Sequence, residues 1–352
     1  KSFKKIFVIT GKNSYFKSGA NKIFDKILLN KSSFFYFKKS YYPEVNELKS
    51  IIESINRFNP DLLIAVGGGS VLDYSKIARV LNLSINLNNQ IINSSYKIVK
   101  KKYKLLAIPT TAGSGAEVTA NAVIYINKKK YSVEHEKLKP DYFFLVPGLI
   151  IKGSKKIKAS AGFDAISQAI ESLISIKSNS RSVNFAKKSL NISLKYFVNY
   201  VNRPTIDNTF KMALAANLSG KAISISKTTV PHALSYPFTA YFKISHGHAV
   251  SLTLNECLNF NYNNINQARS KFSLKDRFNI VFRLAKVKNI VELENYLTNI
   301  KKKTGLEINF KKLGINIDKD YNKILSGVNL QRLKNNPVPL ETRDLYSILI
   351  NK

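Results

Sequence analysis

Three of the four histidines in the chain stand close together, in the stretch PHALSYPFTAYFKISHGHAV at residues 231–250. They are His232, His246 and His248. A neutral imidazole can bind a metal ion or transfer a proton, so a group of histidines can form a reaction centre. A single histidine is more often a buried residue or a loop residue, so the interpretation depends on the other motifs of the chain.

A run of three glycines could bind a phosphate. The stretch IAVGGGSVLDYSKIA places Gly67, Gly68 and Gly69 between an expected strand and an expected helix. Glycines let backbone N–H groups approach a phosphate closely, and the N-terminus of a helix favours its negative charge. We expect Ser70 to cap this helix, with Asp73 as its acidic partner.

A second stretch, AIPTTAGSGAEVTANAVI at residues 107–124, interleaves hydroxyl side chains with small residues. The hydroxyls of Thr110, Thr111 and Ser114 suit a loop that closes over a dinucleotide. Each glycine-containing stretch alone is weak evidence, because any tight turn from a strand to a helix could use one.

The first half of the chain alternates apolar strands with amphipathic helices. We expect strands at residues 4–10, 32–38, 61–68 and 103–111, and helices at residues 18–30, 44–58 and 70–83. Such alternation is typical of a parallel, doubly wound sheet. The sequence therefore predicts an α/β domain in which the glycine-containing stretches follow strands.

After about residue 153 the strand patterns fade and long helical patterns replace them, at residues 161–175, 181–201 and 209–224. We therefore predict two domains. Residues 1–153 form a Rossmann-like α/β domain that binds the dinucleotide, and residues 154–352 form an all-helical domain for metal and substrate.

Length and composition fit an intracellular enzyme. A chain of 352 residues with 44% hydrophobic residues can bury a large core, and a single cysteine excludes an internal disulfide. The first residues, KSFKKIFVIT, lack the long apolar core of a signal peptide, and no apolar run reaches membrane-spanning length. We expect a cytoplasmic protein with no membrane partner.

A net charge of +34 would ordinarily suggest that the protein binds nucleic acid. The lysines are spread along the chain, however, and runs such as KIVKKKYK at residues 97–104 are typical of solvated turns. No zinc finger, RNA-recognition motif or basic zipper helix is present. We predict no nucleic-acid partner, and an attraction for small anionic substrates.

Taken together, these motifs resemble the iron-dependent (group III) alcohol dehydrogenase family, which is related to the dehydroquinate synthases. The resemblance continues through AGFDAISQAIES at residues 161–172, through the histidine stretch, and to LKNNPVPL at residues 333–340. It implies the dehydroquinate synthase-like fold, an NAD(P)-dependent alcohol dehydrogenase or aldehyde reductase, a divalent metal such as iron or zinc, and a homo-oligomer, often a dimer.

The resemblance assigns Asp164, His232 and His246 to the metal site. The fourth position, a histidine in the family, is Gln168 here, and Asp164 and Gln168 share a helix face. A neutral amide oxygen is a weaker ligand than an imidazole for iron or zinc. We therefore expect the metal to be weakly bound, with a metal-free reductase as the alternative.

The catalytic residues that we expect are Tyr236, His248 and Lys227. Tyr236 occupies a position where many family members carry another histidine, and it could donate to the developing alkoxide. Lys227, in SISKTTVPHALSYP at residues 224–237, could neutralise an anionic group at the far end of a small aldehyde. These features resemble the phosphonoacetaldehyde reductases within the family. The alternatives are a general short-chain alcohol or aldehyde dehydrogenase and a cyclase or lyase of the dehydroquinate synthase type.

The cofactor preference is read from the residues that follow the first strand. Family members that prefer NAD carry an aspartate there, where this chain has Gly11, followed by Lys12, Asn13 and Ser14. Loss of the carboxylate removes a repulsion for a 2′-phosphate, and Lys12 adds an attraction. We therefore expect NADP(H) to be favoured over NAD(H). The resemblance adds two further cofactor contacts, Val123 and Lys130.

Overall fold

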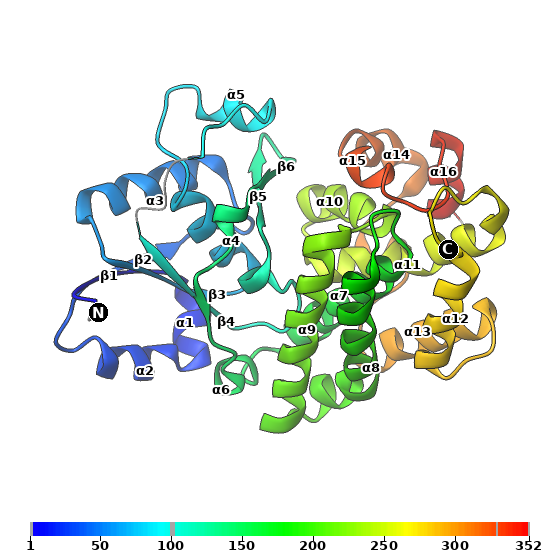
Figure 1. Cartoon of the computed structure of the whole chain (residues 1–352), viewed down its shortest axis with the longest axis horizontal. Helices are drawn as coiled ribbons and strands as arrows, with labels where there is room; N and C mark the ends of the chain where they lie inside the picture. Colours follow the sequence, from blue (N-terminus) through cyan, green and yellow to red (C-terminus); the bar gives the residue numbers. More distant parts are fainter. Residues whose placement is uncertain (1–2, 99–102, 329, 351–352) are drawn as a thin grey trace. The chain divides into compact units, whose positions relative to one another are not determined.

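The computed structural model describes residues 3–98, 103–328 and 330–350 (Figure 1). Part of the predicted solvated turn at residues 97–104 therefore lies outside the described residues. The chain divides into two compact units. The first contains residues 1–111 and 115–153, and the second contains residues 112–114 and 154–352. The first unit is α/β and the second is helical, which confirms the predicted fold class.

The first unit is built on a five-stranded parallel sheet with the strand order β2-β1-β3-β4-β7. The strands are β1 (Lys5–Gly11), β2 (Ser32–Lys38), β3 (Leu62–Gly67), β4 (Lys104–Pro109) and β7 (Tyr142–Phe143). The four longer strands match the predicted ones to within a few residues. Their apolar runs arise because a parallel sheet is covered by helices on both faces.

Alternate side chains of β1 enter two different cores. Phe7 and Ile9 pack with residues of α3 (Val45–Phe58) and α4 (Gly69–Ala78). Ile6 and Val8 pack with residues of α1 (Lys12–Ser18), α2 (Ala20–Ile27) and α6 (Pro147–Ile150) on the opposite face. A short helix, α5 (Leu87–Ile92), completes the helices of this unit.

The first unit also contains a β-hairpin that the sequence analysis did not predict. Strands β5 (Asn121–Ile126) and β6 (Lys129–Glu134) pair in antiparallel fashion. The two residues between them, Asn127 and Lys128, both have positive φ, at 49° and 63°. This is the backbone of the tight turn that fits the twist of paired strands. Residues 121–124 of β5 belong to the stretch in which we expected a loop over the dinucleotide.

The second unit is formed by helices. Those around the candidate site are α7 (Lys155–Ile174), α8 (Ser180–Asn202), α9 (Ile206–Ser226), α10 (Val230–Phe242) and α11 (His246–Asn263). The remainder are α12 (Leu274–Ala285), α13 (Ile290–Thr304), α14 (Ile317–Ser326), α15 (Leu330–Leu333) and α16 (Thr342–Ile350). Helix α7 packs against α8, α9 and α11 (Figure 1), and most of its residues are buried. In the described ranges, no helix has the length and apolarity that crossing a membrane requires.

Candidate metal centre

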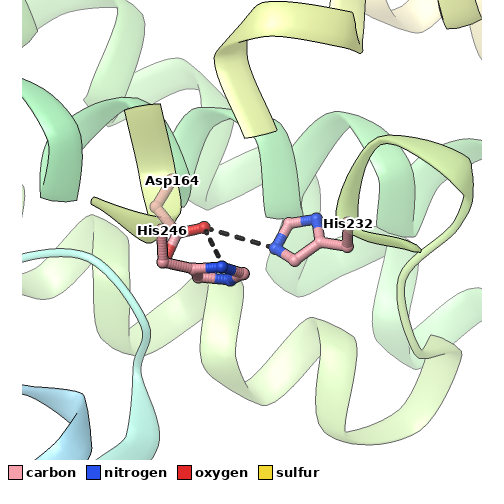
Figure 2. Close-up of side chains that lie close together, drawn as sticks. All are labelled: Asp164, His232 and His246. Carbon is pink, nitrogen blue, oxygen red and sulfur yellow. Dashed lines mark ion pairs between the residues drawn. The ribbon is translucent and has the colours of Figure 1, made fainter. Parts of the chain in front are cut away.

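Three of the predicted metal ligands lie together in the second unit. Asp164 comes from the middle of α7, His232 from the first turn of α10, and His246 is the first residue of α11. The Asp164 carboxylate faces both imidazoles (Figure 2). Its Oδ1 atom is 3.2 Å from His232 Nε2 and 4.0 Å from His246 Nε2. The three ligand atoms lie within 4.8 Å of one another, close enough to bind one ion.

Gly247 allows α11 to reach this cluster. A Cβ atom at this position would lie 2.0 Å from the Ser160 backbone oxygen and 2.7 Å from Asp164 Cβ. Both contacts are far shorter than van der Waals contact, and one of them is to backbone that cannot turn away. Any other residue at position 247 would push the start of α11 away from α7. The glycine therefore lets His246 approach Asp164.

Glu171 fixes the orientation of His232. Its fully buried carboxylate lies 2.5 Å from His232 Nδ1 and also accepts hydrogen bonds from the backbone N–H and hydroxyl of Thr229. A carboxylate on Nδ1–H leaves the Nε2 lone pair available to a metal, which is the usual support of a metal-binding histidine. The sequence analysis missed Glu171. The signal was its spacing, because it lies two turns along α7 from Asp164 on the same face.

The charge state of His232 follows from these neighbours. Burial lowers the pKa of His232, but the Glu171 and Asp164 carboxylates outweigh this effect and raise the pKa to about 10. His232 Nε2 is buried and forms an ion pair with Asp164 Oδ1 at 3.2 Å. A metal ion would displace the proton and bind Nε2 in its place. One carboxylate oxygen and two imidazole nitrogens are a donor set suited to zinc or iron.

Tyr236 lies beside the second histidine. Its ring is nearly parallel to that of His246, with an interplanar angle of 17° and centroids 6.0 Å apart. The preceding residue, Ser235, places its hydroxyl 3.3 Å from His246 Nδ1. Tyr236 is therefore close to the cluster, and the catalytic role assigned to it stays a prediction.

Two other predicted site residues, His248 and Gln168, make hydrogen bonds to the surrounding helices and loops. His248 is buried, its Nε2 atom bonds to the Glu307 backbone oxygen at 2.7 Å, and its backbone N–H donates to Ser160 Oγ. These contacts serve helix packing and give no support to its predicted contact with substrate. Gln168 is buried one turn after Asp164, with its amide nitrogen 3.3 Å from Asp164 Oδ2.

Lys227 follows the last residue of α9 and has an unusual backbone, with φ 60° and ψ 178°. Side chains strongly disfavour this region, which is populated almost only by glycine. The residues on either side, Ser226 and Thr228, are held by hydrogen bonds to their backbone carbonyl oxygens. Asn335 donates to the Ser226 and Thr228 carbonyl oxygens, and Ser175 donates to that of Ser226. Surrounding contacts therefore hold the lysine in a strained conformation.

Most of the predicted cofactor residues lie in the first unit, where neighbouring strands end. Gly11 ends β1, Gly67 ends β3, and Thr110 and Thr111 follow β4. Ligands of open α/β sheets bind outside the carboxyl ends of the strands. Lys12, Asn13 and Ser14 form the first turn of α1, with the Ser14 hydroxyl donating to the Gly11 carbonyl oxygen at 3.0 Å.

The predicted capping of the glycine-rich helix is wrong. Helix α4 begins at Gly69 with Gly68 as its N-cap and no side-chain cap bond, so Ser70 lies inside the first turn. Asp73 is not a capping partner either, because its carboxylate accepts from the Val123 backbone N–H. A glycine cap suits a turn that must leave its N–H groups accessible.

Asp73, Val123 and Lys130 nevertheless lie in one neighbourhood of the first unit. Burial raises the pKa of Asp73 to about 6, and the charges of Lys76 and Lys130 oppose this shift. Lys76 is itself buried and donates to the hydroxyl of Thr119. Ser114 is the exception among the predicted cofactor residues. It belongs to the second unit, where its backbone oxygen lies 3.5 Å from Gln168 Nε2.

Comparison with known families covers nearly the whole chain. Residues 1–147 match the model of iron-containing alcohol dehydrogenases, and residues 158–352 match the C-terminal model of the same family. The chain belongs to the iron-containing alcohol dehydrogenase family. This confirms the resemblance inferred from the motifs.

Curated relatives include a phosphonoacetaldehyde reductase of Streptomyces viridochromogenes, 27% identical over 62% of this chain and 57% of that protein. The 1-propanol dehydrogenase PduQ of Citrobacter freundii is 29% identical over 62% of this chain and 56% of its own length. A long-chain-alcohol dehydrogenase of Geobacillus thermodenitrificans is 31% identical over 55% and 50%. The chain thus spans about half the length of the curated relatives that it matches.

Solved structures agree over almost the full chain. The sulfoacetaldehyde reductase of Bifidobacterium kashiwanohense, solved in complex with NAD+, is 26% identical with a TM-score of 0.85, covering 99% of this chain and 90% of that one. An iron-containing alcohol dehydrogenase of Thermotoga maritima has a TM-score of 0.82 at 24% identity, covering 98% and 90%.

Proposed function

We propose that this protein is an NAD(P)H-dependent reductase of a small anionic aldehyde, with phosphonoacetaldehyde, reduced to 2-hydroxyethylphosphonate, as its first candidate substrate. The observation that carries the proposal is the cluster of Asp164, His232 and His246. The buried Glu171 carboxylate contacts His232 of this cluster and also accepts a hydrogen bond from Thr229, two residues after Lys227. The two relatives named for phosphonoacetaldehyde and sulfoacetaldehyde support it, because both names specify a short aldehyde with an anionic end.

The two parts of the chain take different roles in this proposal. Residues 1–153 bind the dinucleotide through the ends of β1, β3 and β4, and residues 154–352 bind the metal and the substrate. The reaction consumes one aldehyde, one NAD(P)H and one proton, and it yields one alcohol and one NAD(P)+. Hydride transfer from the nicotinamide is the chemistry of the cofactor, while the protein orients the reactants.

Asp164, His232 and His246 would hold the divalent ion, which when bound supplies a Lewis acid for the carbonyl group. Glu171 keeps His232 in the tautomer that such a site needs, through its contact with Nδ1. Tyr236, stacked beside His246, is the candidate donor of the proton that completes the alcohol.

Lys227 is the candidate for recognition of the anionic end. Thr229, two residues further on, is bound to the same Glu171 carboxylate that orients His232. The Glu171 side chain therefore connects the backbone near Lys227 to the metal cluster. A strained residue persists where surrounding structure forces it, and such residues occur often at ligand sites.

The proposal is tested by following NADPH oxidation with phosphonoacetaldehyde, sulfoacetaldehyde, acetaldehyde and propanal. We expect kcat/KM for the anionic aldehydes to exceed that for the neutral ones at least about tenfold, because a charge-assisted contact holds the carbonyl in place. Equal or better use of propanal would favour a general alcohol dehydrogenase, as in the similar 1-propanol dehydrogenase. Activity with none of these aldehydes would favour a cyclase or lyase.

The cofactor preference gives a separate prediction. We expect a higher kcat/KM with NADPH than with NADH, and a shift toward NADH in Gly11→Asp, because the new carboxylate repels a 2′-phosphate. Gly11 has φ −95°, so its backbone accepts a side chain, and the nearest obstacle to a Cβ is the movable hydroxyl of Ser14 at 2.9 Å. Lys12→Ala is the companion variant. Equal kcat/KM with both cofactors in the parent protein would refute the preference.

Metal content gives a further prediction. With one carboxylate and two imidazoles as its strong donors, the site is expected to lose part of its metal during purification. Gln168→His adds an imidazole on the same face of α7 as Asp164, so this variant should retain more zinc or iron per chain. Elemental analysis of both proteins purified in parallel measures this. No gain in metal content would show that an imidazole at position 168 does not reach the ion.

A further inference from the structure

Gln168 stands where a family ligand is expected, yet its hydrogen bonds orient its amide away from that role. The side chain is buried. Its nitrogen lies 3.3 Å from Asp164 Oδ2 and 3.5 Å from the Ser114 backbone oxygen. Its oxygen lies 2.8 Å from the Ser219 hydroxyl, whose single proton is shared between this oxygen and the Ala216 backbone oxygen at 2.9 Å. The nitrogen thus faces two groups that can only accept, and the oxygen faces a hydroxyl that can donate to it.

Reversal of the amide is disfavoured by the same neighbours. An amide oxygen cannot donate, so turning it over would set oxygen against the Asp164 carboxylate and the Ser114 carbonyl. Buried polar groups that lose their partners destabilise the folded protein. Asp164 comes from α7 and Ser114 from the loop after β4, so two separate parts of this unit set the amide orientation.

The contact with Gln168 also determines how Asp164 presents its carboxylate. Oδ2 receives the amide nitrogen, whereas Oδ1 faces His232 Nε2 at 3.2 Å and His246 Nε2 at 4.0 Å. The two oxygens of one carboxylate thus have separate partners. A hydrogen bond to the outer oxygen of a ligating carboxylate is the kind of support that metal sites commonly use.

We propose that Gln168 is a positioning residue and not a metal ligand. Its amide donates to Asp164 Oδ2 and keeps Oδ1 directed at the two histidines, so the metal site of this chain has three protein ligands. This inference rests on the proposed metal site but not on the identity of the aldehyde. A site with three protein ligands leaves its remaining positions to solvent or substrate.

The deciding experiment is a crystal structure of the full chain loaded with zinc alone. We expect zinc on Asp164, His232 and His246, with Gln168 Nε2 still in contact with Asp164 Oδ2 and its oxygen still on Ser219. A Gln168 oxygen within about 2.2 Å of the zinc, the usual zinc–oxygen distance, would overturn the proposal. This readout requires no variant and no substrate. Failure of the proposed aldehyde specificity would therefore leave its outcome unchanged.

Zinc affinity measured by competition with a chelator tests the positioning role. Gln168→Leu keeps the approximate size of the side chain and removes both amide groups. We expect its zinc Kd to rise by about 10- to 100-fold, as is typical when the support of a ligand is lost. Asn261→Leu is the matched control, because this buried amide on α11 pairs with the Asn336 amide and not with the cluster. An unchanged Kd in Gln168→Leu would show that Gln168 does not position Asp164.

Discussion

Lys227→Ala is expected to lower kcat/KM for phosphonoacetaldehyde by about 10- to 150-fold and to leave acetaldehyde reduction nearly unchanged. The loss corresponds to about 1.5–3 kcal/mol, the usual contribution of a hydrogen bond to a charged group. Acetaldehyde carries no anionic group, so it has nothing for the ammonium to bind. Steady-state NADPH oxidation with the two aldehydes measures the ratio.

A control variant at a second lysine shows whether the effect of Lys227→Ala is local or comes from the general positive charge of the chain. Lys243, at the end of α10, is exposed and also has positive φ, at 55°. Lys243→Ala removes one charge from the same unit and should leave both reactions unchanged. If Lys227→Ala slows both aldehydes equally, Lys227 is a structural residue, and anion recognition loses its main support.

The backbone of Lys227 adds a stability comparison that distinguishes strain from charge. Both Lys227→Gly and Lys227→Ala remove the ammonium, so both should lose the anionic preference. Glycine relieves a strain of about 1–3 kcal/mol, while its greater unfolded-state freedom costs about 0.5–1 kcal/mol. We expect Lys227→Gly to be the more stable by about 1 kcal/mol in urea unfolding. If Lys227→Gly is instead the less stable variant by about 0.5–1 kcal/mol, the cost of glycine alone, the strain is absent in solution.

Glu171→Gln is expected to raise the zinc Kd by about 10- to 100-fold, the usual cost of losing the carboxylate behind a metal-binding histidine. The carboxylate accepts from His232 Nδ1–H at one oxygen and from Thr229 at the other. A glutamine keeps the shape but has one donor end and one acceptor end. It therefore cannot satisfy both partners.

Glu294→Gln is the control for this prediction. Glu294 lies in the same unit and accepts from Asn259 Nδ2 at 2.7 Å, and it takes no part in the cluster. Chelator competition measures the Kd, and 15N NMR of the histidine ring reports whether His232 keeps its proton on Nδ1. An unchanged Kd together with an unchanged tautomer would remove Glu171 from the site.

The parallel sheet could be predicted because its central strands β1, β3 and β4 are largely buried, so each of them is a short apolar run bounded by turns. The β5–β6 hairpin could not. Its turn is formed by Asn127 and Lys128, and the second of these is not a residue that marks such turns. Helices α10 and α11 could not be predicted either, because proline and glycine usually interrupt helices, and these two contain Pro231, Pro237 and Gly247.

In the site, the resemblance to the family assigned Asp164, His232 and His246 to a metal ion, and the structure brings these three side chains together. The supporting residues were not recognised. A glutamate such as Glu171 in a long helix is ordinarily a solvated residue, and only the packing of α7 reveals that it is fully buried. The orientation of the Gln168 amide depends on Ser219 and Ser114, which are distant in sequence, so no local pattern could predict it.

The central claim is that metal held by Asp164, His232 and His246 supports reduction of an anionic aldehyde. Its most direct test is NADPH oxidation with phosphonoacetaldehyde, measured beside metal content, before and after exhaustive chelation and after return of zinc or ferrous ion. We predict that activity falls with the metal removed and recovers when metal is returned. Full activity in protein with no detectable metal would contradict this claim and leave stabilisation of the alkoxide to Tyr236.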